Sequence, residues 1–133
     1  MILTIAVDAN PILAALLGGY ARAILFEPRF SFITTSFTID EVQKHLPTIA
    51  DQSGVSVAEL KEALVLLPLT VYARSHYQSS LSEARRRMDH IDATDTDILA
   101  LAIFAEAPVW TNDRHFEKVQ PPIPILKTRD FVL

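Results

Sequence analysis

The fold of this chain is predicted mainly from one stretch, Asp92-Ala-Thr-Asp-Thr-Asp-Ile-Leu-Ala-Leu-Ala-Ile-Phe-Ala-Glu-Ala-Pro-Val-Trp-Thr-Asn-Asp-Arg-His-Phe116. Its apolar run, Ile98 to Ala107, is rich in alanine and leucine and therefore favours a helix. Thr94 is a good N-cap for that helix, and Asp97 at the third position completes a capping box. Since so apolar a helix must be buried, it is expected to pack in the core of the domain.

A short apolar strand is expected directly after this helix. Val109-Trp110 predicts the strand, and the turn-forming residues Thr111-Asn112-Asp113 end it. Aspartates therefore stand just before the helix and just after the strand, at what should be one edge of the domain. Crowded or buried carboxylates are costly unless a cation neutralises them, so this edge is the first place to look for a functional site.

The rest of the chain alternates predicted strands with predicted helices. Strands are expected at residues 2–7, 30–34, 69–73, 109–110 and 125–127. Further helices are expected at 12–17 after an N-cap at Asn10, at 20–26, from 39 onwards with a Thr38–Glu41 capping box and a break at Pro47, at 56–67, and at 80–88. This alternation indicates an α/β fold with a mostly parallel central sheet of four or five strands, covered by helices on both faces.

Composition narrows the class of protein. The 133 residues fit one compact domain, half of them are hydrophobic, and none is cysteine, so disulfides and cysteine-based zinc sites are excluded. A cytoplasmic location is expected. No signal peptide is expected, because Asp8 interrupts the apolar start, and no apolar run reaches the ~20 residues that span a membrane. The net charge of −4 argues against general nucleic-acid binding, although two divalent cations would neutralise it.

Four acids stand where strands give way to helices. Asp8 follows the first strand, and Asp113 follows the fourth. Asp95 precedes the apolar helix, and Glu41 lies in the first turn of its own helix. Each acid alone is equally well explained by helix capping and the helix dipole. The four together, at the carboxyl edge of a parallel sheet, indicate a site for Mg²⁺ or Mn²⁺. Two such ions can activate a water and stabilise the leaving oxygen in phosphodiester cleavage.

The segments around these acids occur in a characteristic order. They are Val7-Asp8-Ala9-Asn10, Thr38-Ile39-Asp40-Glu41-Val42, Asp95 ahead of Ile98-Leu99-Ala100-Leu101-Ala102, and Thr111-Asn112-Asp113-Arg114-His115-Phe116. In that order the chain resembles the PIN-domain ribonucleases, and is similar to the toxins of bacterial and archaeal toxin–antitoxin pairs. Each segment alone is weak evidence, but the ordered set spans residues 7 to 116 and is fairly specific, the last two segments most so.

The resemblance implies a single PIN-like domain over residues 1–133, folded as a three-layer sandwich. It also implies an endoribonuclease that cleaves single-stranded RNA with one or two Mg²⁺ or Mn²⁺ ions. An antitoxin protein as partner and a homodimer are further implications. The sequence does not separate a toxin from a free-standing RNA-processing enzyme.

Carried over residue by residue, the resemblance assigns the catalytic and metal-binding roles to Asp8, Glu41, Asp95 and Asp113. Asp97 is an additional metal ligand, and Asp92 is either an acid of the loop or one that lies behind the metal ligands. Whether Asp95 or Asp97 is the primary ligand stays open, because residues two apart do not share a helix face. Asn10 and Thr111 are expected to orient ligands or water behind the acids. The four histidines show no ligand-like spacing, and His115 is expected to pack in a helical turn.

Affinity for RNA requires cations near the acidic edge. Arg114, adjacent to Asp113, is the first candidate, and Lys44 and Arg22 follow. Few aromatic side chains are available to stack on a base: Tyr20, Phe37, Tyr72, Tyr77 and Trp110, of which Trp110 is expected to pack in the sheet instead.

Two other interpretations remain. A non-catalytic PIN scaffold that binds RNA or protein is disfavoured by the complete acid set, because a decayed site usually loses ligands. A phosphotransfer receiver or an aspartyl phosphatase would need a suitably placed lysine, and none precedes Lys44 or lies between Lys61 and Lys118. The phosphatase would also need an acid two residues after Asp8, where this chain has Asn10.

Overall fold

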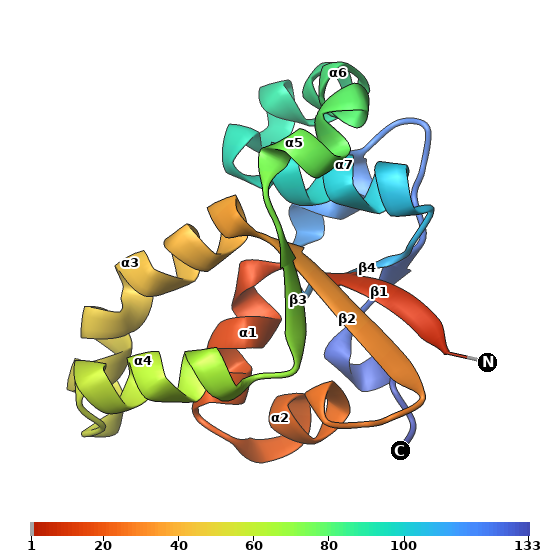
Figure 1. Ribbon diagram of the computed structural model, residues 1–133. Coiled ribbons are helices and arrows are strands. Elements are labelled where there is room, and N and C mark those ends of the chain that lie inside the picture. Colours follow the sequence, from red (N-terminus) through yellow and green to blue (C-terminus); the bar gives the residue numbers. More distant parts are fainter. Residues whose placement is uncertain (1) are drawn as a thin grey trace.

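The computed structural model describes residues 2–133, which build a five-stranded sheet. The strands are β1 (Leu3–Val7), β2 (Phe30–Thr35), β3 (Leu69–Tyr72), β4 (Val109–Trp110) and β5 (Ile125–Leu126). Their order is β3-β2-β1-β4-β5, and every neighbouring pair is parallel. The predicted parallel sheet is confirmed, and the carboxyl ends of β1, β2 and β4 lie at one edge (Figure 1).

Helices cover both faces of the sheet, as the sequence predicts (Figure 1). One face carries α1 (Ala9–Leu16), α2 (Gly19–Leu25), α3 (Ser36–Ser53) and α4 (Val57–Leu66). The other face carries α5 (Arg74–Tyr77), α6 (Leu81–Asp92) and α7 (Thr96–Ala105). Four 3-10 turns complete the chain: η1 (Gln78–Ser80), η2 (Ala93–Asp95), η3 (Arg114–Lys118) and η4 (Thr128–Asp130). None of the helices within residues 2–133 is long and apolar enough to cross a membrane.

The central strands contribute side chains to two separate apolar cores. In β1, Ile5 and Val7 face the α1–α4 layer, whereas Ala6 faces the α5–α7 layer. In β4, Trp110 is fully buried on the first face and packs 4.9 Å, centroid to centroid, from the ring of Phe131. Burial of such side chains on both sides explains why these strands read as continuous apolar runs rather than alternating ones.

Two predicted helix starts are wrong by a few residues. Helix α1 begins at Ala9 rather than after Asn10, because the Asp8 carboxylate accepts the Ala9 N–H at 2.8 Å and acts as the N-cap. Helix α3 begins at Ser36, where Thr35 is the N-cap and its Oγ1 accepts the Thr38 N–H at 2.9 Å. The predicted capping box from Thr38 is therefore absent. The Ser56 cap is confirmed, since its Oγ accepts the Glu59 N–H at 3.1 Å.

The predicted capping box at the start of α7 does not form either. Thr94 lies inside η2, whose N-cap is Asp92, and Asp95 precedes the first residue of α7. The 3-10 turn between α6 and α7 shifts the N-cap by one residue, from Thr94 to Asp95.

The break predicted at Pro47 is also wrong, because α3 continues through it to Ser53. A proline removes the hydrogen bond to the carbonyl four residues earlier, which here belongs to Gln43. Both residues are exposed, so water can satisfy that carbonyl and the helix tolerates the proline.

Candidate active site

A small polar pocket of about 190 Å³ opens at the carboxyl edge of the sheet. Its lining combines the end of β1, the start of α1, one side of α3, the η2 turn and the segment after β4. The residues are Asp8, Ala9, Asn10, Leu13, Thr38, Glu41, His45, Asp92, Thr94, Asp95 and Asp113. All four acids that the sequence singles out therefore line one cavity.

Asp8 is the most firmly held of these acids. It is only 7% exposed, and its Oδ1 accepts the Ala9 N–H while its Oδ2 accepts the Thr111 hydroxyl at 2.9 Å. The same Thr111 oxygen accepts the backbone N–H of Asp113 at 3.0 Å. Thr111 thus joins the two acids that follow β1 and β4 through its hydroxyl. Asn10 bridges the same strands, since its Oδ1 accepts the Asn112 N–H at 3.2 Å.

Three further carboxylates converge on a single nitrogen. His115 Nδ1 lies 3.2 Å from Oδ2 of Asp92, 3.2 Å from Oδ2 of Asp95 and 3.3 Å from Oδ2 of Asp113. One ring N–H can satisfy at most one of these oxygens well, so the cluster holds more acceptors than donors. Suitable ligand atoms of Asp92, Asp95 and His115 all lie within 4.8 Å of one another.

Burial and crowding raise the proton affinity of the two deepest acids. Burial raises the pKa of Asp95 from 3.8 to about 7, and the charge of Asp8 adds to the effect. Burial also raises the pKa of Asp8, against the lowering effect of hydrogen bonds from Ala9 and Thr111. At the rim, hydrogen bonds from Thr94 hold the pKa of Asp92 below its usual value. The pocket therefore resists holding several negative charges by itself.

The donor set fits a hard divalent cation. Carboxylate oxygens are the ligands that Mg²⁺ and Mn²⁺ prefer, and a cation here would offset the repulsion that raises the pKa of Asp95. Asp8, Asp95, Asp92 and Asp113 supply such oxygens, with His115 as a nitrogen donor beside them. Glu41 reaches the pocket from α3, and its Oε1 also pairs with Lys44 Nζ at 3.1 Å.

Asp97 lies away from this pocket. Its side chain is 4% exposed and pairs with Arg74, whose Nε and Nη2 donate to its two oxygens at 3.0 and 2.8 Å. The Tyr77 hydroxyl also donates to it at 2.5 Å. Asp97 therefore links α7 to α5 through hydrogen bonds with Arg74 and Tyr77. This geometry does not support its predicted metal-binding role. Asp95, two residues earlier, is the acid that faces the pocket.

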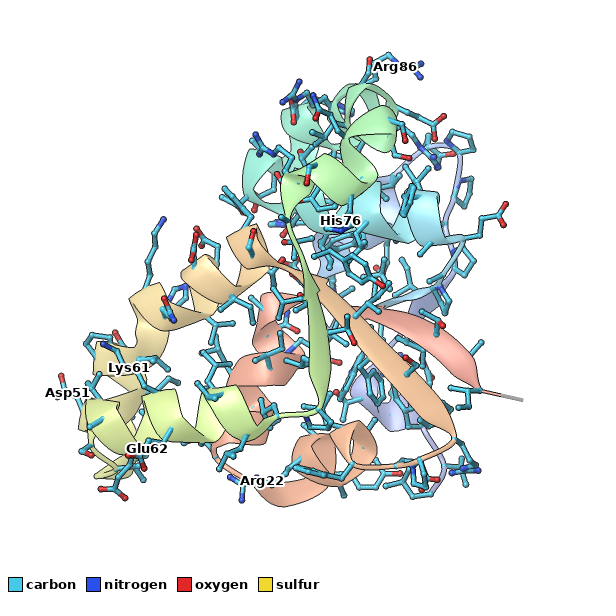
Figure 2. The ribbon with its side chains drawn as sticks, viewed as in Figure 1. Arg22, Asp51, Lys61, Glu62, His76 and Arg86 are labelled. Carbon is cyan, nitrogen blue, oxygen red and sulfur yellow. The ribbon has the colours of Figure 1, made fainter. Side chains whose placement is uncertain are left out.

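The predicted RNA-binding cations are scattered. Arg114 is exposed beside the pocket, and Lys44 pairs with Glu41 at its rim. Arg22 instead donates to the carbonyls of Ala15 and Leu16, at the far end of α1 from Asp8. Figure 2 shows Arg22 at the α1–α2 end of the molecule. The structure does not bring it to the acids.

Comparison with known families identifies the fold family. A family model described as PIN domain matches residues 6–129. The chain belongs to the PIN domain family. No curated protein matches the sequence.

Solved structures share the fold of this PIN domain at low sequence identity. VapBC2 from Rickettsia felis, bound to a promoter DNA fragment, matches with a TM-score of 0.66 and 17% identity over 94% of this chain and 98% of its own. PAE2754 from Pyrobaculum aerophilum matches with a TM-score of 0.62 and 20% identity, over 96% of this chain and 90% of its own. A chain of a toxin–antitoxin complex from Klebsiella pneumoniae matches with a TM-score of 0.61 and 17% identity, over 95% of this chain and 98% of its own.

Sequence reasoning underestimated two residues of the PIN-domain pocket. Asp92, expected to be a loop acid or one behind the metal ligands, lines the cavity itself. Its three-residue separation from Asp95 is the available signal, because residues three apart share a helical face. His115 was expected to pack in a turn, but its ring faces the acids. No spacing rule indicated this, since the orientation depends on how η3 packs against α6 through the buried Phe116.

Proposed function

We propose that this PIN domain is a metal-dependent endoribonuclease that cleaves single-stranded RNA. The observation that carries the proposal is the convergence of Asp8, Glu41, Asp95 and Asp113 in one small pocket at the carboxyl edge of a parallel sheet. The raised pKa of Asp95, together with the surplus of acceptors around His115, supports a requirement for a divalent cation. Phosphodiester hydrolysis is the chemistry that best uses such a site.

The residues divide into two groups by task. Asp8, Asp95, Asp113 and Glu41 would hold one or two Mg²⁺ or Mn²⁺ ions. When bound, these ions would offset charge on the phosphodiester and lower the pKa of an attacking water. Thr111 and Asn10 would keep the carboxylates oriented through the hydrogen bonds that join the ends of β1 and β4.

We further propose that the enzyme is the toxin of a toxin–antitoxin pair and acts in the cytoplasm. The support is the fold likeness to VapBC2 and to a Klebsiella pneumoniae toxin–antitoxin complex. A partner, whether an antitoxin or a second copy in a homodimer, would find exposed apolar side chains on α4 and directly after α2. Val65 is 83% exposed, Leu66 75% and Phe26 57%.

Cleavage by matched variants tests the proposed activity. Asp8→Asn and Asp113→Asn are expected to abolish Mn²⁺-dependent cutting of a labelled single-stranded RNA. Asp97→Asn is the control, because its side chain lies outside the pocket, and it should retain cutting once correct folding is verified by circular dichroism. Retention of cleavage in both pocket variants would refute the mechanism. Folded wild-type protein with neither cleavage nor Mn²⁺ binding would favour the non-catalytic scaffold.

A further inference from the structure

A second, larger groove lies beside the acidic pocket and carries the opposite charge. It has a volume of about 720 Å³ and is lined by Ala14, Gly18, Tyr20, Ala21, Asn112, Arg114, Lys127, Thr128 and Arg129. Three of these side chains are cationic and none is acidic. Its walls come from the α1–α2 corner on one side and from the segments after β4 and β5 on the other.

The groove and the pocket share one wall. Asn10 and Leu13 line the acidic pocket, whereas Ala14 of the same helix and Gly18, just beyond the end of that helix, line the groove. Between the two, Asn112 accepts the Thr128 N–H at 3.0 Å, and its own N–H bonds to Asn10. Helix α1 has eight residues and is therefore about 12 Å long, so one continuous strand of nucleic acid can reach from the acids into the groove.

The charge of the groove is available to a ligand. Arg114 and Arg129 are exposed, and neither forms an ion pair with any residue in the part of the chain that the structure describes. Lys127 is partly neutralised, because its Nζ lies 2.8 Å from Glu117 Oε1. The two arginines are therefore the side chains best placed to contact phosphates.

Tyr20 adds a platform for a base. Its hydroxyl donates to the Phe131 carbonyl at 2.6 Å, which holds the ring in place, while 46% of the residue stays exposed. An aromatic ring that shares a groove with cationic side chains is the pattern used to bind single strands without sequence reading.

We propose that this groove, which we call the basic groove, binds the RNA strand on one side only of the scissile phosphate. The inference rests on the proposed ribonuclease function. It adds the side of the scissile phosphate on which the strand is held and the residues that contact it. Arg114 and Arg129 bind backbone phosphates, and Tyr20 stacks on a base. The acidic pocket repels that backbone unless cations are bound, so the groove supplies the affinity that the pocket lacks.

Binding of an intact strand measures these contacts directly. In an Asp8→Asn background with Mn²⁺ present, fluorescence anisotropy of a labelled 12-nucleotide RNA is measured against salt concentration. Replacing Arg114 and Arg129 together by glutamine is expected to weaken binding and reduce the slope of log K against log salt by about 1.4, since each single-strand phosphate contact contributes about 0.7. Tyr20→Leu is expected to weaken binding about tenfold with little change of slope. Arg86→Gln is the control, because this exposed arginine lies on α6, at the opposite end of the molecule from α2 (Figure 2).

Polarity is tested with methylphosphonates, which remove the charge of one phosphate at a time. Neutral linkages on one side of the cleavage site should weaken binding, and the Arg114 and Arg129 double variant should no longer distinguish them. Equal losses of affinity from neutral linkages on both sides of the cleavage site would overturn the inference, and so would a double variant that binds RNA as Arg86→Gln does. If the wild-type protein still cleaved RNA, either result would leave the ribonuclease function unaffected. If the wild-type protein neither bound nor cleaved RNA with any metal, both would fail together.

Discussion

Replacing Asp95 by asparagine is expected to stabilise the metal-free protein while weakening its binding of divalent cations. Asp95 is 7% exposed, and its pKa is raised from 3.8 to about 7 by burial and by the charge of Asp8. The folded state therefore holds the proton more tightly than the unfolded state. The stability that comes from the protonated carboxyl is fully present below pH 3.8 and is lost as the pH rises through about 7.

The size of the effect follows from the two pKa values. At about 1.36 kcal/mol per pKa unit, the stability lost relative to a pH below 3.8 is on the order of 4 kcal/mol at pH 8 and about 2 kcal/mol at pH 5, where only the unfolded chain releases the proton. Asparagine has no such cost at either pH. The advantage of Asp95→Asn should therefore grow by roughly 2–3 kcal/mol between pH 5 and pH 8, whatever constant difference the amide itself introduces.

Guanidinium unfolding in EDTA at both pH values measures this difference. Asp51→Asn, a change at an exposed acid near the end of α3 (Figure 2), is the matched control and should show no comparable pH-dependent gain. Adding Mn²⁺ at 100 times its Kd should stabilise the wild-type protein by about 2.7 kcal/mol and the Asp95→Asn protein by much less. A variant whose advantage is the same at pH 5 and pH 8 would refute the reasoning about the pocket.

Three further changes probe the surroundings of the pocket. Asp97→Asn should lower the free energy of unfolding by about 1–3 kcal/mol, because it weakens the contacts of α5 with α7, while calorimetry should show unchanged Mn²⁺ affinity. Thr111→Val should weaken Mn²⁺ binding about tenfold or more, because losing the threonine hydrogen bond raises the pKa of Asp8 further. The loss of affinity should be greater at pH 6 than at pH 8, and an equal loss at both pH values would argue against that link. Trp110→Ala should destabilise the fold by about 3–5 kcal/mol in chemical unfolding, and a loss below 1 kcal/mol would contradict the packing of this core.

The strands and the acidic edge were predictable because they depend on local sequence. Apolar runs bounded by acids and turn residues identify β1 and β4, and parallel strands must bring their carboxyl ends together. That rule alone places Asp8 near Asp113, although 105 residues separate them along the printed chain.

What could not be predicted depends on contacts between distant segments. Local sequence does not distinguish Asp95 from Asp97 as the acid of the pocket. The difference depends on Arg74, 23 residues before Asp97, which donates a hydrogen bond to the Asp97 carboxylate. The ring of His115 is directed by the packing of η3, which no periodicity encodes. Asp8 and Asn10 both have side chains that suit an N-cap. Asp8 is the N-cap of α1 because β1 ends at Val7 and the helix begins directly afterwards, at Ala9.

The most direct measurement is a time course of cleavage of a labelled single-stranded RNA panel by the wild-type protein in Mg²⁺, in Mn²⁺ and in EDTA. Cutting with either metal, none in EDTA and recovery when metal is added back is the predicted result, and Asp8→Asn should show no cutting under any condition. Cleavage that persists in EDTA, or that Asp8→Asn retains, would contradict a metal-dependent site built on these acids.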